Sequence, residues 1–463
     1  MTELQKTISP VDGRVYVERE LAAGGTVDRV IHAATTAQQA WRKVALEERA
    51  VICRRFVDAF IAHRDEIALE LTWQMGRPIS QAPGEISGFE ERARYMIDIA
   101  PEALGQTGVG DKPGFHRFIE REPLGVVLVL APWNYPYLTS VNSVLPAIMA
   151  GNAVVLKHSS QTPLCADRFG QAFQEAGLPD GIFQVLHMNH SESARVISQL
   201  PVDYVAFTGS VPGGHAIQQA ASNRFIATGL ELGGKDPAYV RPDIGLDFAV
   251  ENLVDGAFFN SGQSCCGIER IYVHESLFDG FVEGFAERVR QYRLGDPTDP
   301  ETNLGPLVRT AAADHVRRQI EEAVTAGART LIDPGLFPAS QPDSPYLAPQ
   351  VLIDVDHSMS VMRDESFGPV VGIIKVKDDT EALQLMNDSP FGLTASVWTH
   401  DELAALELGD QLKTGTVFMN RCDYLDPALA WVGVKDSGRG CTLSKMGYEQ
   451  LTRPKSFHLR TSL

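Results

Sequence analysis

The sequence predicts an α/β protein with two doubly wound domains, each built on a parallel sheet. Its 463 residues are too many for one hydrophobic core, so two or three domains are expected. From Gly125 onward, short β-branched runs alternate with helical segments, which is the order of a parallel sheet covered by helices. The same alternation starts again after Gly233, which indicates a second domain.

The chain before the first strand run is expected to be helical. Residues 27–44 and 49–75 carry apolar side chains at i, i+3 and i+4 spacing. The second of these segments is expected to form one helix that ends at Gly76 and Pro78. Residues 84–104 are expected to form a third helix. The next stretch, "HRFIEREPLG", alternates polar and apolar residues and predicts an exposed hairpin strand.

The strand runs set the expected domain boundaries. "GVVLVLAP" and "AVVLK" are continuous apolar runs, as in strands buried on both faces, and "GIFQVL" and "VDYVAFTGS" follow them. The alternation resumes through "KDPAYVRP", "LDFAVENLVDGAFFNSG" and "IERIYVHESLFDGFVEGFAERVRQ". We expect one domain from residues 1–105 and 124–232 and a second from residues 233–444. Residues 332–349 are rich in Pro and Ser and are expected to form a surface loop.

Composition argues against several classes of partner. The chain has 41 basic and 59 acidic residues and a net charge of −18, which opposes binding to nucleic acid or to an anionic membrane surface. It has no signal-peptide pattern at its start and no run of about 18 apolar residues, so no membrane span is expected. The six scattered cysteines fit a reducing cytoplasm rather than a disulfide scaffold. Without a CxxC motif, the adjacent pair Cys265 and Cys266 predicts no metal site.

Cys265 is the first candidate for chemistry. It follows Gly262 and Gln263 in "FFNSGQSCCGIER", within a turn. A turn that precedes a helix would aim backbone N–H groups and the positive end of the helix dipole at the sulfur and would lower the thiol pKa. The alternative is a small buried apolar residue. Only one thiol of the pair can enter one pocket, so Cys266 is expected to pack in the core.

Two polar side chains next to predicted strands are further candidates. Glu231, flanked by glycines in "LELGGK", could activate water as a general base. Asn134 follows a predicted buried strand, and ligands bind parallel sheets at the carboxyl ends of their strands. Its amide would suit an oxyanion, with the backbone N–H of Cys265 as a second donor. The alternatives are a solvated loop acid for Glu231 and a turn residue for Asn134.

The glycines of "FTGSVPGG" lie between a predicted strand and a predicted helix. Such a turn could cradle phosphates at the helix N-terminus, although the pattern is not GxGxxG. Lys157, at the end of "AVVLK", could bind ribose hydroxyls or phosphate. A lysine that only aids solubility is the alternative for that position.

With these stretches in hand, the chain resembles the aldehyde dehydrogenase superfamily from about Pro10 to Leu459. The motifs "PWN", "FTGS", "ELGGK", "FxxxGQxC" and "ESFGP" occur in that order. The resemblance implies oxidation of an aldehyde to a carboxylic acid with NAD or NADP, on two Rossmann-like domains for cofactor and catalysis. It also implies a bridging hairpin in residues 106–123, with a partner strand in the C-terminal residues 445–463, and this hairpin pairs with neighbouring subunits. A homodimer or homotetramer is therefore expected.

The resemblance assigns roles residue by residue. Cys265 would be the nucleophile, Glu231 the general base, and Asn134 the oxyanion donor. A thiohemiacetal would transfer hydride to the nicotinamide, and the resulting thioester would be hydrolysed rather than passed to coenzyme A. The positions implied for the cofactor are Trp133, Lys157, Ser160, Thr208, Gly209, Ser210, Leu232, Glu365 and Phe367.

Three departures from the family pattern have consequences. The usual KPxE after the strand lysine is "KHSS" here, so uncharged Ser160 replaces a glutamate that would repel a 2′-phosphate, and NADP is expected to be accepted. Asn142 and Ser143 replace an aromatic residue and a lysine found in many relatives, which makes the substrate funnel more polar and less cationic. The C-terminal "REL" motif is absent.

The sequence says least about the identity of the substrate. The expected lining residues are Tyr135, Leu138, Asn142, Ser264, Arg421, Tyr424 and Leu425. Arg421 could pair with a substrate carboxylate or lie on the surface, and the apolar neighbours favour medium-length aliphatic or aromatic aldehydes. Two alternatives to a hydrolytic enzyme stay open: a dehydrogenase that acylates coenzyme A, and a catalytically silent scaffold. The presence of Cys265, Glu231 and Asn134 argues against the scaffold.

Overall fold

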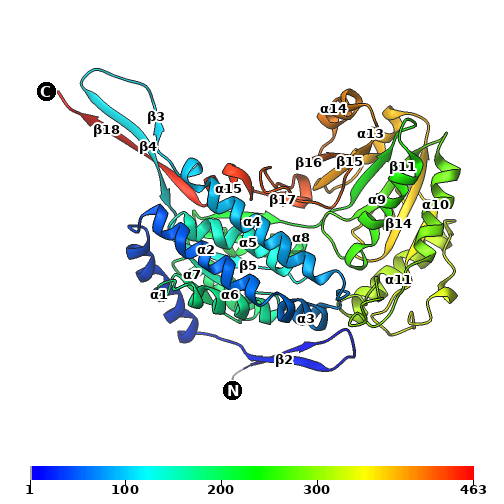
Figure 1. Cartoon of the computed structure of the whole chain (residues 1–463), viewed down its shortest axis with the longest axis horizontal. Helices are drawn as coiled ribbons and strands as arrows, with labels where there is room; N and C mark the ends of the chain where they lie inside the picture. The colour runs from blue at the N-terminus through cyan, green and yellow to red at the C-terminus, as the bar shows by residue number, and fades with distance from the viewer. Residues whose placement is uncertain (1–2, 463) are drawn as a thin grey trace.

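The structure, a computed structural model, describes residues 3–462. Two sheet-based bodies lie side by side, and a three-stranded antiparallel arm projects from the first of them (Figure 1). The α/β class with two mostly parallel sheets is confirmed. A two-stranded N-terminal sheet was not anticipated. It pairs β1 (Leu4–Ile8) with β2 (Val15–Glu20) and runs along the outside of the first body.

The first body holds a six-stranded sheet in the order β17-β9-β8-β5-β6-β7. All neighbours are parallel except β17, which joins β9 antiparallel and comes from the expected catalytic segment. Its strands are β5 (Val126–Leu130), β6 (Ala153–Lys157), β7 (Phe183–Val185), β8 (Tyr204–Thr208), β9 (Ala227–Glu231) and β17 (Gly438–Arg439). Its helices are α1 (Gly25–Trp41), α2 (Leu46–Ala62), α3 (Arg64–Met75), α4 (Ala82–Ala103), α5 (Pro136–Met149), α6 (Pro163–Glu175), α7 (His190–Gln199), α8 (Val211–Ala221) and α15 (Ser444–Gln450).

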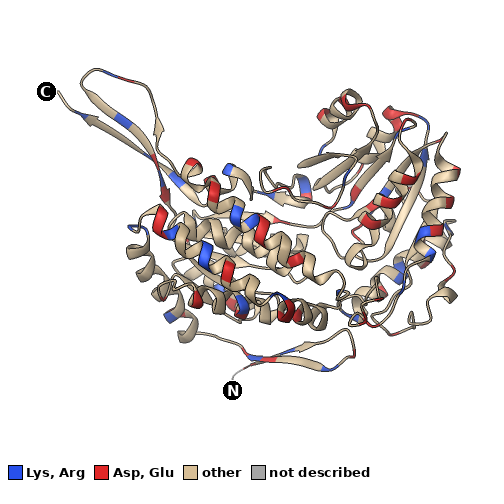
Figure 2. Cartoon of the chain, viewed as in Figure 1, with Lys and Arg blue, Asp and Glu red and all other residues tan. Residues whose placement is uncertain are grey.

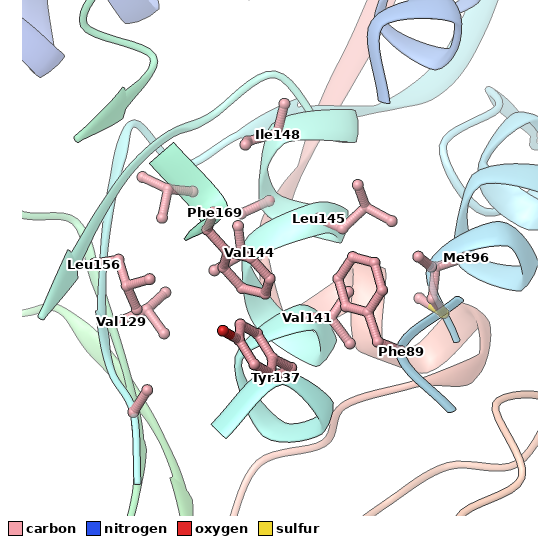
Figure 3. Packing of buried hydrophobic residues seen from close by; sticks show 14 of the residues in the cluster. Phe89, Met96, Val129, Tyr137, Val141, Val144, Leu145, Ile148, Leu156 and Phe169 are labelled. Atoms are coloured by element: carbon pink, nitrogen blue, oxygen red, sulfur yellow. The ribbon is translucent and has the colours of Figure 1, made fainter. Parts of the chain in front are cut away.

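Alternating strand residues explain why this sheet is covered on both faces. In β5, Val127 and Val129 pack into the core with helices α2 to α6, whereas Leu128 and Leu130 pack into the core with α1, α7 and α8. Figure 3 shows the first of these cores, where the side chains of α5 lie between the sheet and Phe89 of α4. Helix α5 can be buried on nearly all sides because its residues are mostly apolar, and this burial anchors the segment that carries Asn134.

The second body holds a seven-stranded sheet in the order β12-β13-β14-β11-β10-β15-β16, parallel except for β12. Its strands are β10 (Asp236–Val240), β11 (Ile268–His274), β12 (Arg329–Thr330), β13 (Gln350–Ile353), β14 (Val370–Val376), β15 (Thr394–Trp398) and β16 (Thr416–Met419). Its helices are α9 (Leu246–Phe258), α10 (Phe278–Arg290), α11 (Thr310–Thr325), α12 (Ser360–Arg363), α13 (Asp379–Asn387) and α14 (Glu402–Gln411), with short 3₁₀ turns η1 (Phe259–Gly262), η2 (Pro334–Leu336) and η3 (Lys435–Ser437).

The arm pairs β4 (Phe115–Pro123) with the C-terminal strand β18 (Thr452–Arg460) and with the short β3 (Thr107–Gly108). Its strands are antiparallel, and most residues of β18 are exposed. Figure 1 shows the arm extending away from both bodies, so its outer edge is open to another chain.

The prediction of a single helix over residues 49–75 is wrong. The segment forms α2 and α3, which are separated at His63, where φ is −103° and ψ is 20°. Two shorter helices can each turn an apolar face to the core, with Phe56 and Phe60 from α2 and Leu71 from α3. Spacing alone cannot detect such a break, because the apolar residues on both sides still fit a helical repeat.

Basic and acidic residues alternate along the outer helices of both bodies (Figure 2). The acidic residues outnumber the basic ones, 59 to 41, which gives the net charge of −18. Among residues 3–462, none of the helices combines the length and apolar character needed to cross a membrane.

Candidate active site

The candidate residues of the first body gather at one edge of its sheet. Lys157, Thr208 and Glu231 are the last residues of β6, β8 and β9, and Asn134 follows the end of β5. The carboxyl ends of parallel strands meet at one edge of a sheet, which is where such folds bind ligands. The four side chains therefore face the same end of the first body.

The loop that carries Cys265 is shaped by glycines and by unusual backbone angles. Asn260 and Ser261 have positive φ values of 51° and 57° in η1. A Cβ on Gly262 would lie 2.4 Å from the carbonyl oxygen of Gly368, and one on Gly234 would lie 2.2 Å from the carbonyl oxygen of Cys265. The "ELGGK", "GQSC" and "ESFGP" segments thus meet at distances that only glycine permits.

The condition under which a helix would lower the pKa of the Cys265 thiol is not met, because no helix directly follows the cysteine pair. The residues after the pair form strand β11, which pairs with β10 and β14, and the preceding helix α9 ends before η1. "IERIYVH" is rich in β-branched and aromatic residues and fills the centre of the seven-stranded sheet. Neither of the elements that flank the cysteine pair therefore aims a helix N-terminus at the sulfur.

Asn134 is buried and lies beside the Cys265 loop. Its Nδ2 donates to the carbonyl oxygen of Gln263 at 3.2 Å, two residues before Cys265. The Gln263 side chain is held in turn, because its amide oxygen accepts from the backbone N–H of Val308 at 2.8 Å. The Asn134 amide thus lies next to the loop that carries Cys265, as expected of an oxyanion donor for this thiol.

A buried ion pair fixes the backbone of Asn134. Arg77 donates to Glu85 at 2.5 Å and also to the backbone carbonyl of Asn134. Glu85 accepts from the backbone N–H groups of Tyr137 and Leu138 at 2.9 and 3.0 Å, in the first turn of α5. Both charged side chains are almost fully buried, so removing either one would leave an unpaired buried charge. This pair was not predicted, because neither residue belongs to a motif.

Glu231 is oriented by two hydroxyl groups. Its carboxylate accepts from Thr442 at 2.6 Å and from Thr208 at 3.0 Å. Burial raises the pKa of Glu231 above its usual value, and the two hydrogen bonds oppose this rise. Thr208, expected at the cofactor, therefore contacts the expected general base. Thr442 was missed, since it lies 211 positions away from Glu231 in the sequence.

Cys266 has a polar partner as well as its place in the core. Its thiol donates to Asp423 at 3.0 Å, and the same carboxylate oxygen accepts from Ser264 at 2.7 Å. Burial raises the pKa of Asp423. Asp423 has a positive φ of 48°, which turns its side chain back towards the cysteine loop. Asp423 was not among the predicted site residues.

A cavity of about 730 Å³ opens between the two bodies, and both Cys265 and Glu231 line it. All seven residues expected to contact the substrate line it too: Tyr135, Leu138, Asn142, Ser264, Arg421, Tyr424 and Leu425. Further polar lining residues were not predicted, namely Arg77, Gln81, Glu85, Ser87, Glu91, Arg92, Thr139, Asn252, Asp255, Asn420 and Asp423. The wall thus combines charged and polar side chains with apolar ones such as Phe259 and Trp431, and the preference for aliphatic or aromatic aldehydes stays a prediction.

The aromatic residues expected near the nicotinamide face each other. The rings of Trp133 and Phe367 are 5.6 Å apart at 76°. Glu365 accepts from the backbone N–H of Gly234 at 2.9 Å, and burial raises the pKa of Glu365 to about 7. A buried pair of Lys235 with Glu269 holds this loop, because Glu269 accepts from the backbone N–H of Phe367 at 2.9 Å.

The chemistry of the remaining positions fits a dinucleotide. Burial lowers the pKa of Lys157 to about 8, and no carboxylate among residues 3–462 lies within 4.0 Å of its ammonium group. Gly209 and Ser210 lead into α8, whose first turn is capped by the Ser210 hydroxyl accepting from the N–H of Gly213 at 3.3 Å. A cation and an exposed helix N-terminus at one sheet edge suit ribose and phosphate groups. The Leu232 side chain packs under the same helix at Gly214.

Ser160 is exposed just beyond Lys157. Its carbonyl oxygen accepts from Thr7 at 2.7 Å and from Gln5 at 3.1 Å, so the N-terminal sheet fixes its backbone. His158, between Lys157 and Ser159, is buried, and its Nδ1 accepts from the N–H of Ser159 at 2.9 Å. Burial lowers the pKa of His158 to about 3, so the imidazole is neutral. Within residues 3–462, no group of three or more His, Cys, Asp or Glu side chains is arranged to hold a metal ion.

Comparison with known proteins decides the family. The model of the aldehyde dehydrogenase family matches residues 2–457. The chain belongs to this family. The "Succinate-semialdehyde dehydrogenase [NADP(+)] 1" of Mycobacterium tuberculosis is 33% identical over 461 residues, which covers 97% of this chain and 98% of that protein. The "3,6-anhydro-alpha-L-galactose dehydrogenase" of Streptomyces coelicolor is 35% identical over 455 residues, or 98% and 92% of the two chains.

The solved structures agree with this assignment. An indole-3-acetaldehyde dehydrogenase in complex with NAD+ superimposes with a TM-score of 0.94 and 30% identity, and the match covers 99% of this chain and 93% of that one. This aldehyde dehydrogenase is therefore an enzyme of NAD(P)-dependent aldehyde oxidation, on the fold of its family.

Proposed function

We propose that Cys265 attacks the aldehyde and that Glu231 hydrolyses the resulting thioester. One observation carries this proposal: the thiol and the carboxyl group line the same cavity, although they come from different bodies of the protein. A nucleophile and a separate base within one cleft are the minimum set for covalent oxidation followed by hydrolysis. A scaffold without activity would not require both groups to face the same space.

The first half-reaction needs a stabilised oxyanion. Attack of the Cys265 thiolate on the carbonyl carbon forms a thiohemiacetal, and its oxygen becomes negatively charged. The amide of Asn134, held by Arg77, would leave its contact with Gln263 to donate to this oxygen, with the N–H of Cys265 as second donor. Trp133, Lys157, Ser210, Glu365 and Phe367 would hold NAD(P), which would supply the hydride acceptor for the collapse of the thiohemiacetal to the thioester.

The second half-reaction needs an activated water. Glu231, in its ionised form, removes a proton from a water that attacks the thioester carbon, and the carboxylic acid leaves Cys265 as a thiol. Thr208 and Thr442 orient the carboxylate for this step. Because a base is built into the cavity, hydrolysis is favoured over transfer to coenzyme A.

Product analysis tests the hydrolytic assignment. We expect that the enzyme, supplied with an aldehyde and either NAD or NADP in the absence of coenzyme A, releases one equivalent of free acid for each reduced cofactor. Addition of coenzyme A should not raise the rate or give acyl-CoA. Acid release that depends on coenzyme A would instead support the acylating alternative.

We further propose that NADP is accepted because Ser160 carries no charge. Its backbone is anchored by the N-terminal sheet, and the neighbouring cation Lys157 has no carboxylate partner among the described residues. A negatively charged residue at this position would repel a 2′-phosphate, since like charges brought together at a binding site are costly.

The variant Ser160→Glu should reverse this tolerance. We expect kcat/KM with NADP to fall by about 10- to 100-fold, whereas the value with NAD changes by less than about threefold. Steady-state rates with both cofactors give the ratio directly. Ser222→Glu, at the exposed end of α8, adds the same charge away from the strand ends and should leave the ratio unchanged. An unchanged ratio in Ser160→Glu would remove the role assigned to Ser160.

A homodimer or homotetramer is proposed from the arm. The strand β18 is mostly exposed, and its sheet projects from the body with an open edge. Open edges of this kind pair with other chains. The location in a reducing cytoplasm stays a prediction, supported by six cysteines without a disulfide among them.

A further inference from the structure

Arg92 is a buried cation of the cavity that lacks a carboxylate partner. It lies on α4 with 7% exposure, and its Nη1 donates to the backbone carbonyl of Leu138 at 2.8 Å and to the side-chain oxygen of Asn142 at 3.4 Å. Among residues 3–462, no carboxylate oxygen lies within 4.0 Å of its guanidinium group. Both partners are neutral, so the charge is taken out of water without a counter-ion, which is costly unless an anion arrives.

The other arginines of the cavity are already engaged. Arg77 forms a buried pair with Glu85 at 2.5 Å. Arg421 is exposed, and its guanidinium stacks over the ring of Tyr424 at 3.5 Å. Arg92 is therefore the cation of this wall that is both buried and free to bind a further charge.

The acidic residues of the cavity do not neutralise Arg92 at close range. Glu85, the carboxylate whose charge acts most strongly on Arg92, is paired with Arg77. Glu91 accepts from the hydroxyl of Tyr424 at 3.0 Å, Glu231 is held by its two threonines, and Asp423 is held by Ser264 and Cys266. Burial raises the pKa values of Glu231, Asp255 and Asp423, which lessens their negative charge.

Asn142 supplies a second unused donor beside Arg92. It is 2% exposed, it lines the cavity, and its Nδ2 has no hydrogen-bond partner. A buried N–H group without a partner is rare in folded proteins and points to a ligand that fills the gap. The amide and the guanidinium are joined by their mutual hydrogen bond, so both can reach one group.

We propose that Arg92 and Asn142 form an anion subsite that binds the carboxylate of a semialdehyde substrate while its aldehyde group reaches Cys265. This inference rests on the function proposed above and narrows it to aldehydes that carry a carboxylate at their far end. Guanidinium groups bind carboxylates through two parallel hydrogen bonds, and the adjacent amide adds a third donor. In this subsite, the far end of the substrate would contact charged and polar donors. A funnel for neutral aldehydes would offer that end an aromatic or aliphatic side chain.

The unmodified enzyme gives the first test. Its kcat/KM should be about 10- to 100-fold higher for succinate semialdehyde than for the methyl ester of the same aldehyde, because the ester lacks the charge. An aldehyde with a terminal ammonium group should be the poorest of the three. Equal values for acid and ester, or preference for the ammonium compound, would overturn the inference without touching the role of Cys265. No activity with any of the three would count against the proposed function itself.

Variants of Arg92 test whether the preference for the carboxylate substrate arises at this side chain. Arg92→Met should lower kcat/KM for succinate semialdehyde by about 10- to 100-fold, mainly through KM, and change the value for the methyl ester by less than about threefold. Arg92→Lys should restore part of the loss for the acid. Arg94→Met is the matched control: Arg94 lies on the same helix, pairs with Asp58 and Glu90, and does not line the cavity. A purely structural role of Arg92 would lower both substrates equally and would contradict the proposal.

Discussion

Cys265→Ala should lower kcat for aldehyde oxidation by at least about 10³-fold, with either cofactor. The thiol is the only group of the cavity assigned to covalent attack, and alanine cannot replace it. Cofactor binding should persist, because none of the residues assigned to the dinucleotide changes. Steady-state rates, together with cofactor binding followed by fluorescence quenching, separate these two outcomes.

The neighbouring cysteine provides the control for this experiment. Cys266→Ala removes a thiol that donates to Asp423, but Ser264 still donates to the same carboxylate. Activity should stay within about tenfold of the unmodified enzyme, the usual scale of one lost hydrogen bond. Labelling with iodoacetamide should inactivate Cys266→Ala and leave Cys265→Ala unmodified within the cavity. The reverse pattern would transfer the nucleophile to Cys266.

Glu231→Gln should separate the two half-reactions. Oxidation should still give a rapid burst of reduced cofactor close to one equivalent per active site, whereas steady-state turnover should fall by about 10²- to 10⁴-fold. Glutamine keeps the shape of the side chain and can still contact Thr208 and Thr442, but it cannot accept a proton from water. Stopped-flow absorbance at 340 nm measures both phases. Normal turnover in this variant would refute the role of Glu231 as general base.

The hydroxyl of Thr442 should set the pH at which hydrolysis begins. A general base works in its ionised form, so the rate should rise as pH passes through the pKa of Glu231, which burial raises. The hydrogen bond from Thr442 stabilises the carboxylate and lowers this pKa. Thr442→Val should therefore move the acidic limb of the kcat profile to higher pH, while Glu231→Gln should abolish the limb. An unshifted limb in Thr442→Val would contradict the assignment.

The cavity shows how far inference from motifs extends. The expected nucleophile, the expected base and all seven expected substrate residues line it, because they were placed by motifs or by the resemblance to the family. Arg92, which carries the specificity argument together with Asn142, and Asp423, which holds Cys266, belong to no motif and could not be found in this way. They matter because of their neighbours in space, and those neighbours come from distant parts of the sequence.

The cysteine loop shows that a motif can be recognised although the secondary structure around it cannot be predicted. The turn at Cys265 was predicted, but the element after it was left open, because the short apolar run of a central strand buried on both faces cannot be told from a helix by local periodicity. The long helix over residues 49–75 failed for a related reason. Apolar spacing continues through His63, although the chain bends there so that both halves reach the core.

The sequence by itself determined the family, the α/β class and the chemical types at the strand ends, since motifs and alternating apolar runs are local properties of the chain. Only the tertiary structure decided that Thr442 meets Glu231, that Asp423 holds Cys266, and that Arg92 lacks an acidic partner. These contacts join segments up to 211 positions apart, and their energies depend on burial. Burial and partnership arise when the chain folds, so a residue type alone cannot reveal them.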